Sequence, residues 1–152
     1  MRARFASGGG PGFLFLREST AMSHAVGTFE VKLVPQPPED KDQDPSLARM
    51  TIDKQFHGDI EGKSKGHMLS AGTPEKGSAG YVAIEKVSGT LHDRRGTFVL
   101  QHSATMNRGV PHMSITVVPD LGTGELAGLA GSFSIQVAAG KHSYDFEYSL
   151  PD

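Results

Sequence analysis

The chain has no cysteine and no tryptophan, and only 3 of its 152 residues are tyrosine. The absence of cysteine excludes disulfide bonds, thiolate metal ligands and a cysteine nucleophile. No apolar run approaches the roughly 18 residues that a membrane helix requires, so we expect no membrane partner. The formal net charge is only −2. Nucleic-acid binding normally needs a clustered basic surface, so we expect no nucleic-acid partner either.

Glycine is the residue present in excess, with 19 copies in a chain that is 37% apolar. This share is well above the roughly 7% that is usual, and it follows no collagen-like period. A chain of this length is typical of one domain with one hydrophobic core. Many glycines between β-branched runs therefore predict a single domain rich in turns and built from strands.

The first 22 residues differ from the rest of the chain. They contain a triple glycine at positions 8–10 and a four-residue apolar stretch at positions 13–16. A secretory signal needs about 7–15 apolar residues, so this stretch is too short, and we expect a cytoplasmic protein. We predict that residues 1–22 form a disordered tail and that residues 23–152 form the folded domain. A further hypothesis is that Met22 is the biological start.

Eight segments show the alternation of polar and apolar residues that is typical of half-buried strands. No segment of twelve or more residues has helical periodicity. Short connections such as Asn107-Arg108-Gly109 favour an up-and-down antiparallel arrangement. We therefore predict an all-β fold with one antiparallel eight-stranded β-barrel, and a two-sheet sandwich as the alternative. The eight segments are residues 28–34, 48–58, 63–69, 81–87, 97–106, 112–118, 132–138 and 141–150.

Two residues are candidates for acid–base chemistry inside the predicted barrel. Glu85 shares one strand face with Tyr81, and His102 lies on an apolar face of another strand. A carboxylate in an apolar interior is costly unless it is paired or protonated, so its pKa is expected to rise. Within reach of His102, Glu85 could act as a general acid or base. The alternatives are a satisfied buried Glu85 beside a hydrogen-bonded core histidine, or a Glu85 at the barrel mouth paired with Arg94 or Arg95.

Four aromatic residues are candidates for lining a ligand cavity: Tyr81, Phe98, Tyr144 and Tyr148. A tyrosine offers an apolar body and a polar tip, which suits a ligand pocket and suits packing equally well. The seven histidines contain no His-x-His pair and no His-Glu-x-x-His motif, so we predict no metal site and no cofactor. No Gly-x-Ser-x-Gly elbow marks a serine nucleophile.

One glycine-rich element carries a family resemblance. Residues 122–131 read Gly-Thr-Gly-Glu-Leu-Ala-Gly-Leu-Ala-Gly and resemble the motif of allene oxide cyclases and dirigent proteins. Glycine at these sites would permit a bulge or a short wound turn at a barrel rim. The alternative is a glycine-rich loop without chemical function, because the element lacks the Lys-Ser/Thr of a phosphate-binding loop.

A wider match covers most of the chain after its proline-rich loop. The segments at 80–91, 96–102, 117–119, 122–131 and 140–151 resemble a bacterial family catalogued as domain of unknown function 3224. Asp120, Leu121 and Ala104 depart from that family's pattern. The resemblance implies a small barrel similar to the allene oxide cyclase barrel, and it implies no established activity.

Three functions follow as expectations. The first is binding of a small apolar or aromatic molecule in the barrel cavity. The second is an enzyme of the cyclase or isomerase type with Glu85 as acid or base, which rests on the allene oxide cyclase resemblance. The third is a structural homo-oligomer, because two strand faces are apolar enough to pack against another copy. These faces consist of Val82 and Ile84, and of Phe133, Ile135 and Val137.

Overall fold

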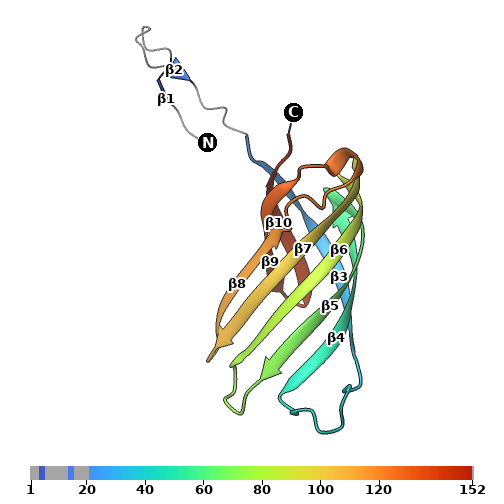
Figure 1. Cartoon of the computed structure of the whole chain (residues 1–152), viewed down its shortest axis with the longest axis vertical. Helices are drawn as coiled ribbons and strands as arrows, with labels where there is room; N and C mark the ends of the chain where they lie inside the picture. Colours follow the sequence, from blue (N-terminus) through green and yellow to red (C-terminus); the bar gives the residue numbers. More distant parts are fainter. Residues whose placement is uncertain (1–3, 6–13, 16–20, 152) are drawn as a thin grey trace.

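The computed structural model describes residues 4–5, 14–15 and 21–151, and the last of these ranges forms a β-barrel (Figure 1). Two short strands, β1 (Arg4–Phe5) and β2 (Leu14–Phe15), pair with each other before it. The predicted disordered tail falls mainly outside the described residues. The barrel strands are β3 (Ser23–Pro35), β4 (Leu47–Gly58), β5 (Ile60–Gly72), β6 (Ala79–Leu91), β7 (Arg94–Asn107), β8 (Val110–Val117), β9 (Ala130–Ala138) and β10 (Lys141–Ser149).

The barrel has the simplest antiparallel order. Each strand pairs with the next along the chain, and β10 pairs with β3 to close the ring. All eight segments predicted from the sequence are strands, so the eight-stranded antiparallel barrel is confirmed and the sandwich alternative is wrong. Closure joins the first and last strands, which would otherwise present unpaired edges.

Two hairpin turns explain why the strands connect so tightly. Arg108 and Gly109 both have positive φ, at 48° and 88°. Ala139 and Gly140 repeat this pattern, with φ of 53° and 78°. Two consecutive residues with positive φ are typical of the type I′ turn, whose twist matches that of the flanking strands. The Asn107-Arg108-Gly109 signal in the sequence therefore has its predicted structure.

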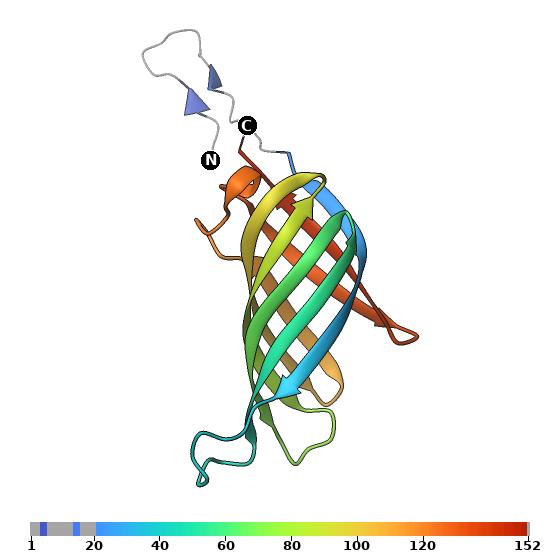
Figure 2. The same cartoon turned by 90° about the vertical axis from the view of Figure 1, so that its right-hand side faces the viewer.

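The two ends of the barrel differ (Figures 1 and 2). The closed end carries the short 3₁₀ helix η1 (Gly124–Leu126), where Leu126 is fully buried and Leu129 nearly so. The glycine-rich element thus forms a short wound turn that covers this end. The open end carries the loops at residues 36–46 and 73–78. No helix in the described part of the chain is long and apolar enough to cross a bilayer.

Aromatic side chains fill the closed half of the barrel. Phe98 and Phe146 stack with ring centroids 5.7 Å apart, and the ring of Phe56 meets that of Tyr144 edge-on at 5.7 Å. All four side chains are buried. Offset and edge-on contacts of this kind favour association beyond the burial of apolar area alone. The closed half is therefore a packed core.

The open half of the barrel is less completely closed. Among the described residues, β8 and β9 share one bridge, between Thr116 and Ser132. The tip of the β9–β10 hairpin projects away from the wall (Figure 2). Met113 on β8 and Val137 on β9 share the alternation of the inner face, yet they are 48% and 63% exposed. The inner surface of this half is consequently open to solvent.

Of the two apolar strand faces that were predicted to pack against a second copy, one lies inside the barrel and the other lies on its outer surface. Phe133 and Ile135 lie opposite Phe146 and Tyr144 on the inner face, and Phe133 is buried in the core. The apolar face of β9 therefore belongs to the barrel interior and is not an outer face for a second copy. Val82 and Ile84 do alternate outward on β6, and each is about half exposed.

Candidate functional site

A cluster of four polar side chains crosses the barrel interior beneath the aromatic core. Lys54 on β4, Ser64 on β5, Glu85 on β6 and His102 on β7 face inward and are all buried. We call these four residues the polar cluster. Gly66 lies opposite Glu85 on the neighbouring strand, and a Cβ there would collide with the backbone of β6. A glycine at this position thus lets the two strands pack closely beside the carboxylate.

Glu85 is the centre of the polar cluster. Its Oε1 accepts hydrogen bonds from Lys54 Nζ at 2.8 Å and from His102 Nε2 at 2.6 Å. Its Oε2 accepts a hydrogen bond from Ser64 Oγ at 2.5 Å. Both carboxylate oxygens are therefore occupied. Among the described residues, no buried side-chain nitrogen or oxygen lacks a hydrogen-bond partner.

These contacts decide the charge of Glu85. Burial alone raises the pKa of its carboxyl group, but the hydrogen bond from His102, the charge and hydrogen bond of Lys54 and the hydrogen bond from Ser64 outweigh burial and lower the pKa to about 2. Glu85 is therefore a carboxylate at neutral pH. Its partner is Lys54, not Arg94 or Arg95, and the arrangement matches the alternative of a satisfied buried glutamate.

Lys54 is the cation that makes this burial tolerable. Its ammonium group also lies 4.7 Å from the centre of the Phe29 ring, within range of a cation–π contact. The sequence analysis gave Lys54 no role, although Lys54 alternates with Phe56 and so shares its strand face. The sequence signal for this role was that Lys54 is a single lysine among the apolar residues on one face of its strand. Its partner became visible only with the pairing of the strands.

Tyr81 extends the cluster toward the open end of the barrel. Its hydroxyl lies 3.3 Å from His102 Nδ1, so Tyr81, His102 and Glu85 form a hydrogen-bonded series. Burial and the nearby charge of Glu85 raise the pKa of the Tyr81 phenol, which therefore stays protonated at neutral pH. The sequence analysis considered Glu85 as an acid or base if it lay within reach of His102. The structure brings these two residues into contact and adds Tyr81 through His102.

A pocket of about 340 Å³ opens beyond Tyr81, and we call it the end pocket. Four of the 6 methionines of the chain line it. Met50 and Met68 are direct cross-strand partners, as are Ala104 and Met113. The lining residues are Met50, Met68, Ser70, Ala79, Gly80, Tyr81, Ala104, Thr105, Met106, Pro111, His112 and Met113. Sequence reasoning missed the methionines, although Met50 and Met106 already shared faces with inward residues.

The other three predicted ligand-binding residues lie elsewhere. Phe98 stacks in the packed core. The Tyr144 hydroxyl accepts a hydrogen bond from the Ile60 amide and donates one to the His57 carbonyl, each at 2.9 Å. Burial is the main reason that the pKa of Tyr144 rises to about 12. Tyr148 hydrogen-bonds to His92 near the closed end. Of the four candidates, Tyr81 alone lines the end pocket.

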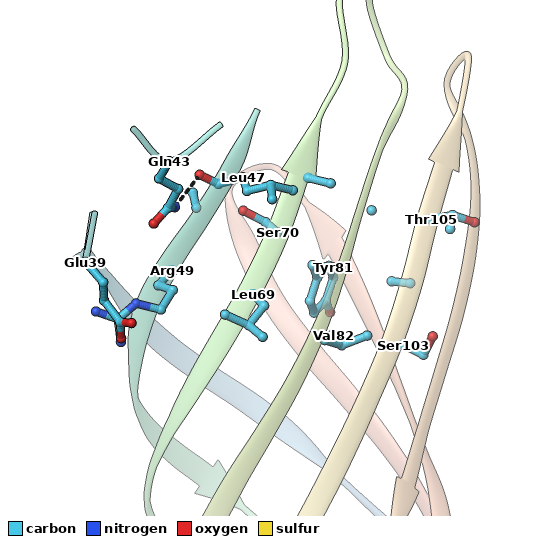
Figure 3. Close-up of a pocket in the computed structure, with 14 residues that line it drawn as sticks. Glu39, Gln43, Leu47, Arg49, Leu69, Ser70, Tyr81, Val82, Ser103 and Thr105 are labelled. Atoms are coloured by element: carbon cyan, nitrogen blue, oxygen red, sulfur yellow. Dashed lines mark hydrogen bonds and ion pairs between the residues drawn. The ribbon is translucent and has the colours of Figure 1, made fainter. Parts of the chain in front are cut away.

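A second hollow, of about 540 Å³, lies against the outer face of β4–β7, and we call it the outer groove (Figure 3). Leu69 and Val82 are cross-strand partners on this outer face. Glu39 and Arg49, paired at 3.5 Å, border it. The groove also reaches the wall at Tyr81, so the two hollows border one stretch of the barrel.

The described residues offer no evident metal centre. Within that part of the chain, no group of three His, Cys, Asp or Glu side chains is close enough together to hold one ion. The chemistry available in the barrel is therefore that of the polar cluster, the Tyr81 phenol and the thioethers of the end pocket.

Comparisons with known proteins agree with the fold. The family model described as "Protein of unknown function (DUF3224)" matches residues 25–148. A solved structure of a protein of unknown function from that family, from Shewanella oneidensis MR-1, is 44% identical. It covers 87% of this chain and 100% of its own, with a TM-score of 0.81. No curated protein matches the chain. The chain therefore belongs to the DUF3224 family.

Proposed function

We propose that the protein binds one small, mainly apolar molecule in the end pocket. The observation that carries this proposal is the exposure of apolar side chains on the inner face of the barrel. Met106 and Met113 are 41% and 48% exposed, although the same face is fully packed in the closed half. Contiguous apolar surface that stays open to water inside a concave site is typical of ligand binding.

The limits of the pocket define the size of the ligand. The polar cluster and the aromatic core fill the barrel beyond Tyr81, so a ligand enters no further. A volume of about 340 Å³ lies near the lower end of the usual range of roughly 300–1,000 Å³ for ligand sites. Methionine side chains are flexible and polarizable, so they can adapt to ligands of differing shape. We therefore expect a small ligand and a tolerant pocket.

A neutral fluorescent probe, N-phenyl-1-naphthylamine, tests this proposal. Met106→Trp would fill the end pocket with a larger side chain at a partly exposed site. Gln101→Trp is the matched control, because Gln101 lies on the outer face of the same strand and lines neither hollow. We expect Met106→Trp to weaken probe binding at least tenfold and Gln101→Trp to leave it unchanged. Equal binding by both variants would contradict the proposal, as would a wild-type protein that binds no probe.

An acid–base enzyme is the second candidate function. The hydrogen-bonded series from Glu85 through His102 to Tyr81 favours it, because such a series can orient and polarise the hydroxyl of a residue that lines a pocket. The resemblance of residues 122–131 to allene oxide cyclases supports a cyclase or isomerase. Glu85 does not line the end pocket, so in this proposal Tyr81 exchanges the proton with the substrate and Glu85 acts through His102. An activity that survives Tyr81→Phe would exclude this mechanism.

A homo-oligomer is the third candidate. Leu69 and Val82 are cross-strand partners on the outer face, and with Ile84 they form an apolar strip in which each side chain is about half exposed. Association would remove this strip from water. Light scattering on the wild type and on Ile84→Lys tests the candidate. A wild-type monomer at high concentration would exclude it.

A further inference from the structure

One edge of β9 has no strand beside it in the open half of the barrel. Along its other edge, β9 pairs with β10 over its whole length, from Ala130 to Ala138. On the β8 side, the described residues form one bridge, between Thr116 and Ser132. Residues 134–138 lie beyond this bridge, and the tip of their hairpin projects away from the wall (Figure 2). This stretch of β9 therefore presents an edge that no described strand pairs.

A proline weakens β8 as a partner for this edge. Continuing the register of the single bridge toward the open end would place Pro111 opposite Val137. Val118, directly after β8, donates its backbone hydrogen bond to the Val99 carbonyl on β7. Alternation along the strand then directs the backbone of odd-numbered residues, Pro111 among them, toward β9. Because proline has no N–H group, β8 offers no donor opposite Val137.

β9 also lacks the charges and the proline that protect the free edges of natural sheets from pairing with another chain. Among the eight strands of the barrel, β9 alone contains no Asp, Glu, Lys, Arg, His or Pro. Its outward residues Ser134 and Gln136 are uncharged and exposed, and Val137 is exposed as well. An unprotected edge of this kind is a template for an added strand.

We infer that β9 pairs with the β9 strand of a second copy of this chain, antiparallel and across a two-fold axis. An antiparallel strand is its own complement under two-fold symmetry, so the same edge serves both copies. Two uncharged strands meet without like-charge repulsion. The projecting hairpin tip carries the edge away from the barrel wall, where a second tip reaches it (Figure 2). This contact is separate from ligand binding and from the outer strip of Leu69, Val82 and Ile84.

The alternation of side chains selects the register of this pairing. Ile135 and Val137 share the inner face of β9, and Gln136 points outward. A two-fold axis at Gln136 places Ile135 of each copy opposite Val137 of the other, so inward residues meet inward residues. An axis at Ile135 would instead require Phe133, which is buried in its own barrel core. The two Gln136 residues are then direct partners, with Cα atoms about 4.5–5.5 Å apart.

Single cysteines test this register, because the chain has none of its own. Gln136→Cys should form a disulfide between two copies under mild oxidation, since the Cα separation lies in the range that a disulfide spans. Ser134→Cys is the matched control on the same outward face, and its two copies would lie about 14 Å apart along the strands. We expect about tenfold more cross-linked dimer from Gln136→Cys than from Ser134→Cys. Equal cross-linking by both variants, or none by Gln136→Cys, would overturn the inference.

Two lysine substitutions separate the β9 contact from the outer strip. Val137→Lys places a charge on the β9 edge at a side chain that is 63% exposed, and Val82→Lys does the same on the outer strip, where Val82 is 50% exposed. In light scattering at high concentration, we expect wild type and Val82→Lys to be dimers and Val137→Lys to be a monomer. A wild-type monomer would overturn the inference, as would a dimer that Val137→Lys leaves intact. Loss of the dimer in Val82→Lys alone would assign association to the outer strip and overturn the β9 contact.

Discussion

Removing the charge of Glu85 should destabilise the barrel in a pH-dependent way. Glu85→Gln keeps the shape of the side chain but leaves the ammonium of Lys54 without its counter-charge. Lys54 is 8% exposed and Glu85 is fully buried, so water cannot replace the missing carboxylate. Breaking a buried ion pair on one side typically costs about 3–5 kcal/mol.

The pKa of Glu85 gives a second, independent value for the free energy of folding that is lost in Glu85→Gln. The folded protein lowers this pKa from 4.5 to about 2. At 1.36 kcal/mol per pKa unit, the shift corresponds to about 3 kcal/mol of folding free energy. The two approaches agree, and we expect Glu85→Gln to lose about 3 kcal/mol at pH 7.

The sign of the pH dependence follows from the direction of the shift. Because the folded state lowers the pKa, the stabilising contribution is complete above pH 4.5, the pKa of the unfolded chain, and declines as the pH falls toward 2. About 2 kcal/mol of it should be lost by pH 3. The difference between wild type and Glu85→Gln should therefore shrink between pH 5 and pH 3.

Urea unfolding at pH 7, 5, 4 and 3, followed by circular dichroism, measures this difference. Glu147→Gln is the control, because Glu147 is an exposed carboxylate on β10 and surface charges contribute little. It should unfold like the wild type at each pH. A difference between wild type and Glu85→Gln below 1 kcal/mol at pH 7, or one that stays constant down to pH 3, would refute the reasoning.

Four further substitutions test the packing of the barrel. Phe56→Ala should cost about 3–5 kcal/mol because it empties part of a packed core. Met113→Ala should cost less than half as much, because 48% of Met113 is already exposed; equal losses in thermal unfolding would contradict an open half. Gly66→Ala should destabilise by about 2 kcal/mol or more, since its Cβ would collide with β6, and unchanged unfolding would exclude that contact. Tyr144→Phe should cost about 1–3 kcal/mol in urea unfolding through two lost hydrogen bonds, and a neutral effect would show that they contribute nothing.

The fold was predictable because its signals are local. Alternation along each strand and the turn at Arg108 and Gly109 depend on neighbouring residues alone. Both features persist in the structure, although β3, β5 and β6 are each 13 residues long and extend well beyond the predicted segments. Alternation also placed Glu85 and His102 on faces that turned out to point inward.

The site depended on information that alternation lacks. The sequence of β9 shows one apolar face, but only its pairing with β10 reveals that Phe133 faces the core. The partnership of Lys54 and Glu85 spans two strand pairings and could not be read from either strand alone. The exposed part of the inner face lies where β8 and β9 share a single bridge, and alternation within one strand does not reveal how two strands pair. That is why the Met113 side of the interior was not predicted to be open.

Methyl signals of the methionines test the central claim most directly. In protein labelled with ¹³C-methyl methionine, the signals of Met50, Met68, Met106 and Met113 report on the end pocket, and the exposed Met22 lies outside it. We predict that 4-hexylphenol shifts these four signals in a saturable way and leaves that of Met22 in place. Unchanged signals of all four methionines at saturating concentrations of 4-hexylphenol would contradict the account.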